Sequence, residues 1–298
     1  MYYNDIAYID KLDRLQEVYP MSAALSEAIG VSRRSLLNWR DRPDSIKVEH
    51  RFNIDVLYCK HFVIPVWDTK KQSFTPVLLP DELSSNELLL TPFLRRISYG
   101  TIEIETGMAR DDFERAVDAK KLPKNMSIEV FHEAVNTYLT HKWLWQKCIT
   151  HGERFVISEE GIRSLHGDFM RGLRDDAGFY SGKVRVMGGL EAVHTTLPED
   201  IPEEMNRWVF KCKGVETMDE IARAHAYFIA IHPFGDGNGR VGRGLVMAQC
   251  LNAGLMPPLF DGENRALYYA AMEHAMVHGR HAPLIRLFIE SAKRGRQA

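Results

Sequence analysis

The sequence predicts a mainly α-helical protein with one short β-hairpin. Apolar residues recur at helical spacing in the first 60 residues and through most of the chain after residue 150. Strand-like alternation followed by glycines occurs in "GKVRVMGGLEAVHTTLPED", residues 182–200. No alternating series of strand and helix patterns is present, which argues against an α/β fold.

Composition limits the classes of protein that the chain could represent. Its 298 residues are 45% hydrophobic and 26% charged, values that are ordinary for globular domains. A net charge of -2 gives no general attraction to nucleic acid, and no run of 18 apolar residues suggests a membrane span. The four cysteines, Cys59, Cys148, Cys212 and Cys250, are widely spaced, so we expect reduced thiols in a cytoplasmic protein.

The first segment, residues 1–62, predicts a helix-turn-helix-like module. In "SAALSEAIGVSRRSLLNW" a short helix ends at Gly30, and Ser32 caps a second helix. Arg33 and Arg34 suit contacts with DNA phosphates, although acidic residues follow closely. The alternatives are a DNA-binding module, a helical scaffold, or a contact with a second copy in a homo-oligomer.

Residues 63–148 predict a connecting region with a second, weaker copy of this module. Aligning "LSEAIGVSRRSLLNW" with "IEIETGMARDDFERA" places Gly30 over Gly107 and Leu36 over Phe113. Between the copies, residues 61–87 contain prolines and β-branched residues that indicate extended chain and loop. After a boundary at "KKLPKNMS", residues 127–146 predict a further helix, and we expect the last domain to cover residues 149–298.

The stretch "HPFGDGNGRVGR", residues 232–243, carries the clearest chemistry. A helical pattern precedes it, Pro233 interrupts that pattern, and a second helical pattern follows. The loop therefore leads into a helix N-terminus, whose unpaired N–H groups and positive dipole favour an anion. Glycines allow the backbone to approach that anion closely, and they stand at Gly235, Gly237 and Gly239.

Four side chains complete a site for a nucleotide phosphate. Arg240 and Arg243 lie three residues apart, so they share a helix face and can clamp phosphate oxygens. Asp236 is an oxygen ligand suited to Mg²⁺ beside phosphates. His232 lies on the other side of the loop and can act as a general base near neutral pH. Together they predict transfer of a phosphate-containing group to a hydroxyl.

Two common nucleotide-binding motifs are excluded. Residues 237–242 match GxGxxG, but the Rossmann motif requires a preceding strand and a surrounding βαβ unit. A P-loop requires a lysine after its glycines, and none follows here.

The same stretch resembles the signature of Fic-domain proteins, HxFx(D/E)GNGRxxR, without departure at any fixed position. The resemblance extends over residues 156–189, 197–208 and 267–291. It implies a Fic-type helical core with a short β-hairpin flap over residues 149–298. One departure is Ser181-Gly182, where many members carry tyrosine and arginine, which puts the docking of a target in doubt.

The resemblance implies an enzyme that transfers AMP from ATP to a Tyr, Thr or Ser hydroxyl of a target protein. The target would dock as an added strand on the flap near Lys183–Leu190. The implied roles are base for His232, loop anchor for Phe234, Mg²⁺ ligand for Asp236, anion cradle for Gly237, Asn238 and Gly239, and phosphate clamps for Arg240 and Arg243.

Other functions stay open at this point. The motif is compatible with transfer of another nucleotide or phosphate-containing group. A different class is a DNA-binding regulator whose Fic core senses nucleotide without turnover. The intact GNG argues against the related kinase branch.

Glu105 has two interpretations. The first is an inhibitory helix, which the resemblance implies because many Fic proteins carry the motif [S/T]xxxE[G/N]. Its glutamate pairs with the second arginine of the signature and inhibits the enzyme. Thr101 to Thr106 fits this pattern except for its last position. The same residues also form the first helix of the second helix-turn-helix copy, which is the interpretation we favour. Inhibition would then come from a separate antitoxin-like partner or be absent.

Overall fold

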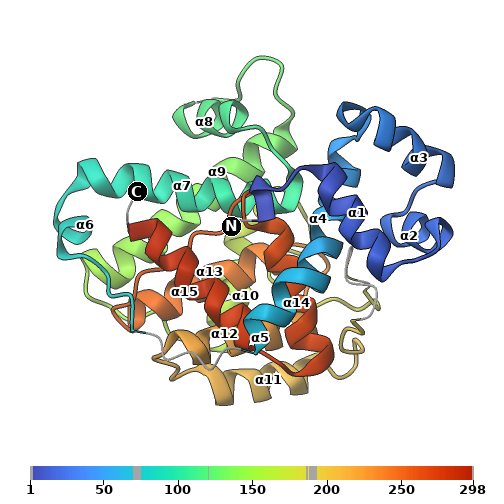
Figure 1. Ribbon diagram of the computed structural model, residues 1–298. Helices are drawn as coiled ribbons and strands as arrows, with labels where there is room; N and C mark the ends of the chain where they lie inside the picture. The colour runs from blue at the N-terminus through green and yellow to red at the C-terminus, as the bar shows by residue number, and fades with distance from the viewer. Residues whose placement is uncertain (1–2, 70–74, 120, 186, 188–192, 297–298) are drawn as a thin grey trace. The chain divides into compact units, whose positions relative to one another are not determined.

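The structure is a computed structural model that describes residues 3–69, 75–119, 121–185, 187 and 193–296. It consists of helices joined by connections of very different length (Figure 1). The elements are η1 (Tyr3–Asp5), α1 (Tyr8–Val18), α2 (Ser22–Ile29), α3 (Arg33–Asp41), η2 (Pro43–Ser45), α4 (Val48–Tyr58), η3 (Cys59–Val63), α5 (Ile64–Asp68), α6 (Asp81–Ser85), α7 (Glu87–Thr106), α8 (Arg110–Asp118), α9 (Ile128–Trp145), η4 (Gln146–Thr150), α10 (Glu159–Phe169), α11 (Ile201–Cys212), α12 (Met218–Ile231), α13 (Asn238–Asn252), α14 (Arg265–His278) and α15 (Ala282–Arg296).

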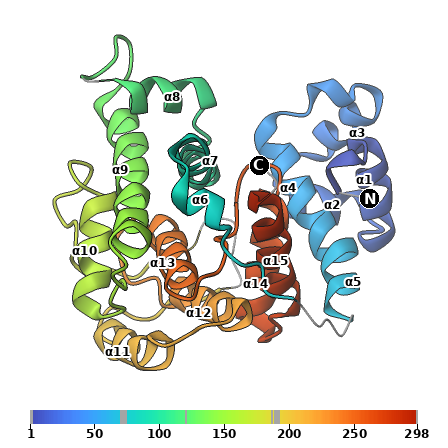
Figure 2. The same cartoon turned by 90° about the vertical axis from the view of Figure 1, so that its left-hand side faces the viewer.

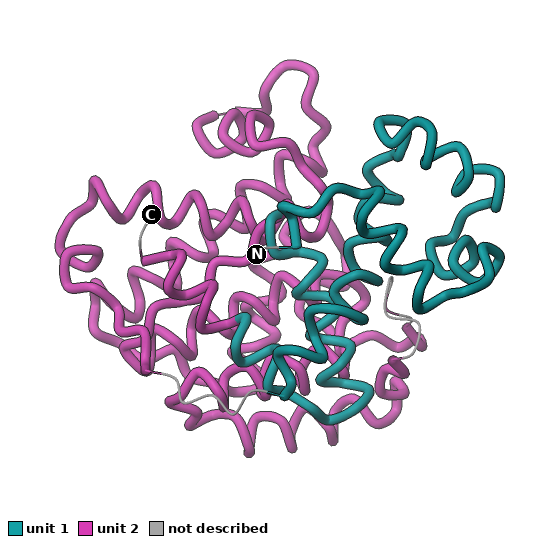
Figure 3. The backbone as a smooth tube through the Cα atoms, in the orientation of Figure 1, with its two compact units in different colours: residues 1–72, 263–287 teal, residues 73–262, 288–298 magenta. Residues whose placement is uncertain are grey.

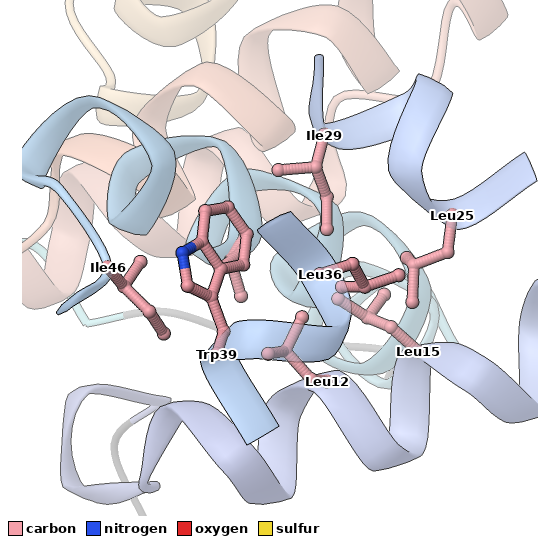
Figure 4. Close-up of a cluster of buried hydrophobic side chains, with 8 residues drawn as sticks. Leu12, Leu15, Leu25, Ile29, Leu36, Trp39 and Ile46 are labelled. Atoms are coloured by element: carbon pink, nitrogen blue, oxygen red, sulfur yellow. The ribbon is translucent and has the colours of Figure 1, made fainter. Parts of the chain in front are cut away.

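The chain divides into two compact units, which Figure 3 distinguishes by colour. The first comprises residues 1–72 and 263–287, and the second comprises residues 73–262 and 288–298. In the first unit, the amphipathic helices α1 to α4 enclose a hydrophobic core (Figure 4). Its buried members are Leu12, Leu15, Leu25, Ile29, Leu36, Trp39, Ile46 and Ile54.

The helix–glycine–helix turn expected near residue 30 is present in this unit. Gly30 ends α2 with φ 80° and ψ 40°, a left-handed conformation that favours glycine. The Ser32 hydroxyl accepts a hydrogen bond from the Ser35 N–H at 3.1 Å and thereby caps α3. Leu36 and Trp39 then point into the core.

The same local turn recurs between α7 and α8 in the second unit. Gly107 ends α7 with φ 68°, and α8 starts three residues later, as α3 does after Gly30. Met108 and Phe113 are buried in a small core between these helices and α9. The two turns are alike, but α7 has 20 residues and α2 has eight, so the elements around them differ.

The expectation of extended chain over residues 61–87 is wrong for part of that segment. Ile64–Asp68 is an α-helix, with Pro65 in its first turn. Proline is accommodated there because the π-helical turn η3 runs directly into α5 and interrupts the regular helical bonding that proline would break. Asp81–Ser85 is also helical.

In the second unit, α13 lies at the centre and packs against α7, α9, α10 and α12 (Figure 2). Twelve consecutive residues of α13, from Arg240 to Leu251, are buried. Such burial on all sides is expected of a helix enclosed by others. The loop that precedes α13 is therefore fixed on a rigid framework.

The mainly α-helical fold class is confirmed. Among the described residues, strand pairing is limited to the isolated bridges Leu78–Leu255 and Tyr180–Phe234. The predicted flap hairpin at 183–190 includes Val186 and residues 188–190, which lie outside the described residues. No helix in the described ranges is both long and apolar enough to cross a membrane.

Candidate functional site

The site is built on the loop between α12 and α13. A capping box fixes the start of α12, because the Thr217 hydroxyl accepts from the Glu220 N–H while the Glu220 carboxylate accepts from the Thr217 N–H. The helix ends at His232, which has φ 55° and ψ 54°. A left-handed histidine is uncommon, and here it turns the chain into Pro233 and the glycine-rich loop.

His232 is oriented as a proton acceptor. Its Nδ1–H donates to the Ile229 carbonyl oxygen at 3.3 Å, so Nε2 carries the lone pair. Burial lowers the pKa of His232, and the bond to Ile229 partly opposes that effect. The imidazole is therefore neutral at pH 7, as a general base requires.

Phe234 and Asn238 hold the loop in shape. The Asn238 side chain accepts from the Phe234 N–H and donates to the Phe234 carbonyl oxygen, both at 2.9 Å. Both residues are buried. The side chain of Asn238 thus closes the loop on itself, and Phe234 anchors it in the core.

His166 on α10 supports the same loop, and the sequence analysis missed it. Its ring stacks on that of Phe234 with centroids 3.9 Å apart. Nδ1 accepts from the Gly178 N–H at 2.8 Å, so Nε2–H donates to the Asp236 carbonyl oxygen at 3.1 Å. Burial lowers the pKa of His166 to about 4, which keeps this arrangement of protons at neutral pH. One histidine on an amphipathic helix carries no sequence signal of this role.

The glycines of the loop allow neighbouring groups to approach the backbone more closely than a side chain would permit. Gly237 has φ 76°, and a Cβ on it would lie 2.6 Å from Met170 Sδ. A Cβ on Gly239 would overlap the carboxylate of Glu105. The backbone at the start of α13 is thus open to a carboxylate, and the same geometry suits a phosphate.

Arg240 points into this region from the first turn of α13. Its side chain is 3% exposed, and Nη2 lies 3.3 Å from Asp236 Oδ2. Nη1 lies 3.6 Å from Glu133 on α9, a neighbour that the sequence analysis also missed. Within the described part of the chain, Nε and Nη1 make no hydrogen bond. A buried guanidinium with unused donors is prepared to bind an anion.

Arg243 is bound by Glu105. Arg243 Nη2 lies 2.5 Å from Glu105 Oε1 and donates to the Thr101 carbonyl oxygen at 3.2 Å. The Arg243 side chain is 3% exposed and that of Glu105 is 23% exposed. This is the contact predicted by the inhibitory interpretation of Glu105, the one we did not favour from sequence.

The donor set at the loop fits a magnesium ion that also binds phosphates. Asp236 presents a side chain that is 52% exposed. Mg²⁺ usually takes one or two protein carboxylates and completes its shell with phosphate oxygens and water. Groups of three or more His, Cys, Asp or Glu that could enclose a metal are absent from the residues described.

Comparison with known proteins identifies the class of protein that this site defines. Residues 156–250 match the model of the Fic/DOC family. The chain is 35% identical over 103 residues to a protein adenylyltransferase Fic of Nematostella vectensis, covering 33% of this chain and 24% of the relative. It is 26% identical over 197 residues to a probable protein adenylyltransferase of Aquifex aeolicus, covering 63% and 58%. The chain thus spans less than two thirds of these relatives.

Solved structures support the same fold. A Fic-domain signalling protein of Bacteroides thetaiotaomicron has a TM-score of 0.62 at 18% identity, covering 80% of this chain and 95% of that one. A fragment of Fic-1 of C. elegans also has a TM-score of 0.62, at 16% identity, covering 95% and 97%. Residues 156–250 thus match the Fic/DOC family in sequence, and the fold of the chain is that of Fic-domain structures.

Proposed function

We propose that this protein transfers AMP from ATP to a hydroxyl side chain of a target protein. His232 Nε2 takes the proton of the target hydroxyl, whose oxygen attacks the α-phosphorus of ATP. The bond from that phosphorus to the bridging oxygen breaks, and pyrophosphate leaves. The curated relatives that bear the name protein adenylyltransferase support this reaction.

The residues of the loop divide the work of holding ATP. The amides of Gly237, Asn238 and Gly239 cradle phosphate oxygens at the start of α13. Arg240 binds the β-phosphate through its unused Nε and Nη1 donors, and Arg243 takes the γ-phosphate. Asp236 holds Mg²⁺, which neutralises charge on the phosphates when bound.

The observation that carries this proposal is the geometry of His232. A half-buried, neutral imidazole whose Nε2 carries the lone pair stands at the start of a loop that leads into a helix N-terminus with a buried arginine. Neither half alone would favour group transfer. Together they support a base acting beside an anion site, as transfer to a hydroxyl requires.

Intact mass spectrometry after incubation with Mg²⁺, a cell lysate and each of ATP, UTP and GTP tests the reaction. The mass added to the modified protein identifies the group that is transferred. His232→Ala should lower the rate by about 10²- to 10⁴-fold, while Arg207→Ala on the exposed face of α11 should leave it unchanged. Equal labelling by the His232→Ala variant would contradict the proposed role of base.

The contact between Glu105 and Arg243 supports a resting state that is inhibited. The Glu105 carboxylate lies against Gly239, where a phosphate oxygen would bind, and it occupies the arginine assigned to the γ-phosphate. ATP must displace it to bind productively. Because the carboxylate comes from α7 of the same chain, this inhibition needs no antitoxin-like partner.

A second function is favoured by the exposed face of α3. With Leu36 and Trp39 buried, α3 exposes Arg33 and Arg34 in its first turn and Asn38 further along the helix. A capped second helix that presents such residues suits entry into the major groove of DNA. We propose that the first unit binds DNA through this face.

Fluorescence anisotropy with a 30-base-pair duplex measures this binding. Arg33→Ala and Arg34→Ala should each weaken the affinity for DNA. Each should also reduce the slope of log affinity against log salt concentration by about one, because one fewer phosphate is contacted. Arg207→Ala serves as the control, since α11 belongs to the other unit. If the affinity for DNA did not change with salt concentration or with either α3 substitution, this face of α3 would be excluded as the DNA-binding surface.

A further inference from the structure

Three charged side chains converge over Gly235, between His232 and Asp236. A Cβ built on Gly235 would lie 3.0 Å from Arg185 Nη2, 3.0 Å from Asp176 Oδ2 and 3.1 Å from Arg174 Nη2. Any larger residue at 235 would disturb this group. Glycine therefore admits charged groups from two other segments to the rim of the loop.

Two of the three charges neutralise each other. Arg174 donates to Asp176 through Nε at 2.5 Å and through Nη2 at 2.8 Å, a bidentate pair. The bond from Arg174 lowers the pKa of Asp176, so the carboxylate is ionised at neutral pH. Arg185 supplies the remaining positive charge.

Hydrogen bonds fix Arg185 through both its backbone and its side chain. Its carbonyl oxygen accepts from the Thr195 hydroxyl at 2.8 Å, and its Nε donates to Ser181 Oγ at 3.2 Å. Ser181 is itself fixed to the loop, because its N–H donates to the Pro233 carbonyl oxygen at 2.8 Å. Arg185 forms no ion pair with a carboxylate within the described ranges. The guanidinium is therefore positioned over Gly235, near enough for its charge to lower the pKa of His232, and it still has donors for a ligand.

We propose that Arg185 determines specificity by binding the carboxylate of an Asp or Glu next to the target hydroxyl. A guanidinium presents paired N–H donors in the geometry of a carboxylate. Since an extended chain advances about 3.3 Å per residue, the acidic residue would lie within about two positions of the modified one. This inference rests on the proposed AMP transfer, and it adds the class of target sequence.

Mapping the modified sites in a lysate tests the inference. The full chain is incubated with lysate and ATP, with and without Glu105→Ala, and modified residues are located by mass spectrometry. Asp and Glu should be enriched roughly tenfold within two positions of the modified hydroxyl, the selectivity expected of a charged hydrogen bond. Arg185→Gln should abolish the enrichment, Arg185→Lys should retain part of it, and Arg185→Glu should favour Lys and Arg instead.

The outcomes separate this inference from the proposed function. Arg171→Gln is the matched control, because Arg171 lies in the same segment but pairs with Asp168 and is 75% exposed. The hydroxyls modified by the Arg171→Gln variant should still have Asp or Glu enriched within two positions. Abundant sites without acidic enrichment, or an enrichment that survives Arg185→Glu, would overturn the role of Arg185 while leaving AMP transfer intact. A complete lack of modified sites would reject both.

Discussion

At the scale of single residues, Arg240 and Arg243 lie three apart on α13 but meet different surroundings. Arg240 faces Asp236 and Glu133 and keeps unused donors, whereas Arg243 is bound by Glu105. His232 differs from both, because its imidazole is neutral at pH 7. The residues of the loop thus differ in their resting state: the His232 imidazole is neutral, and the Arg243 guanidinium is paired.

The dependence of activity on pH should report this state of His232. Burial lowers its pKa below the ordinary value of about 6.5. The base is active when neutral, so kcat/KM should rise with pH through a midpoint below 6.5 and be constant near pH 7. Steady-state kinetics between pH 4.5 and 8 would check this. A midpoint above 6.5 would mean that His232 is not buried as described.

At the scale of elements, α7 brings Glu105 to α13 and α12 presents His232. The contact between Glu105 and Arg243 joins residues that are 138 positions apart in sequence. It depends on the packing of α7 beside α13. Two helices therefore control the two functional sides of the loop.

Removing the Glu105 carboxylate on α7 should raise the rate of AMP transfer. A hydrogen bond to a charged group contributes about 1.5–3 kcal/mol, so Glu105→Ala should raise the rate of AMP transfer roughly tenfold or more. The rate at low ATP concentration is the measurement. Glu103→Ala is a neighbouring control, since Glu103 binds the Gly262 N–H instead of Arg243. An unchanged rate for Glu105→Ala would refute the inhibited resting state.

The capping box of α12 should contribute to stability. Thr217→Ala removes the acceptor for the Glu220 N–H, and loss of such a cap costs about 0.5–2 kcal/mol. Urea denaturation would measure the loss. Glu216→Ala is the control, because only the backbone N–H of Glu216 joins this network. Equal stability of the two variants would show that the cap is dispensable.

At the scale of the whole molecule, three histidines are buried in the helical core of the second unit. They come from three helices, and burial is the main cause that lowers the pKa of each, to about 3 for His141 and His225 and about 4 for His166. All three are neutral in the folded protein at pH 7. In the unfolded chain each regains a pKa near 6.5.

These histidines should make the protein sensitive to acid. Below pH 6.5 the unfolded chain binds protons that the folded chain does not, so stability is full above that pH and falls as the pH decreases. Each histidine contributes a slope of about 1.4 kcal/mol per pH unit until its folded pKa is reached. Urea denaturation at pH 7, 6 and 5 would measure the decrease. Constant stability over this range would contradict the neutral burial of these residues.

The sequence by itself determined the helical fold class and the glycine-rich loop before a helix at residues 232–243, on which the proposed chemistry rests. Both are local: helical spacing follows from 3.6 residues per turn, and a glycine-rich loop before a helix presents its amides wherever it occurs. The turns at Gly30 and Gly107 were predictable for the same reason. Only the tertiary structure decided that Glu105 binds Arg243, that His166 supports the loop and that Arg185 stands over Gly235. These contacts join segments far apart in the chain, and their partners depend on how helices pack, which the spacing of residues along one segment does not specify.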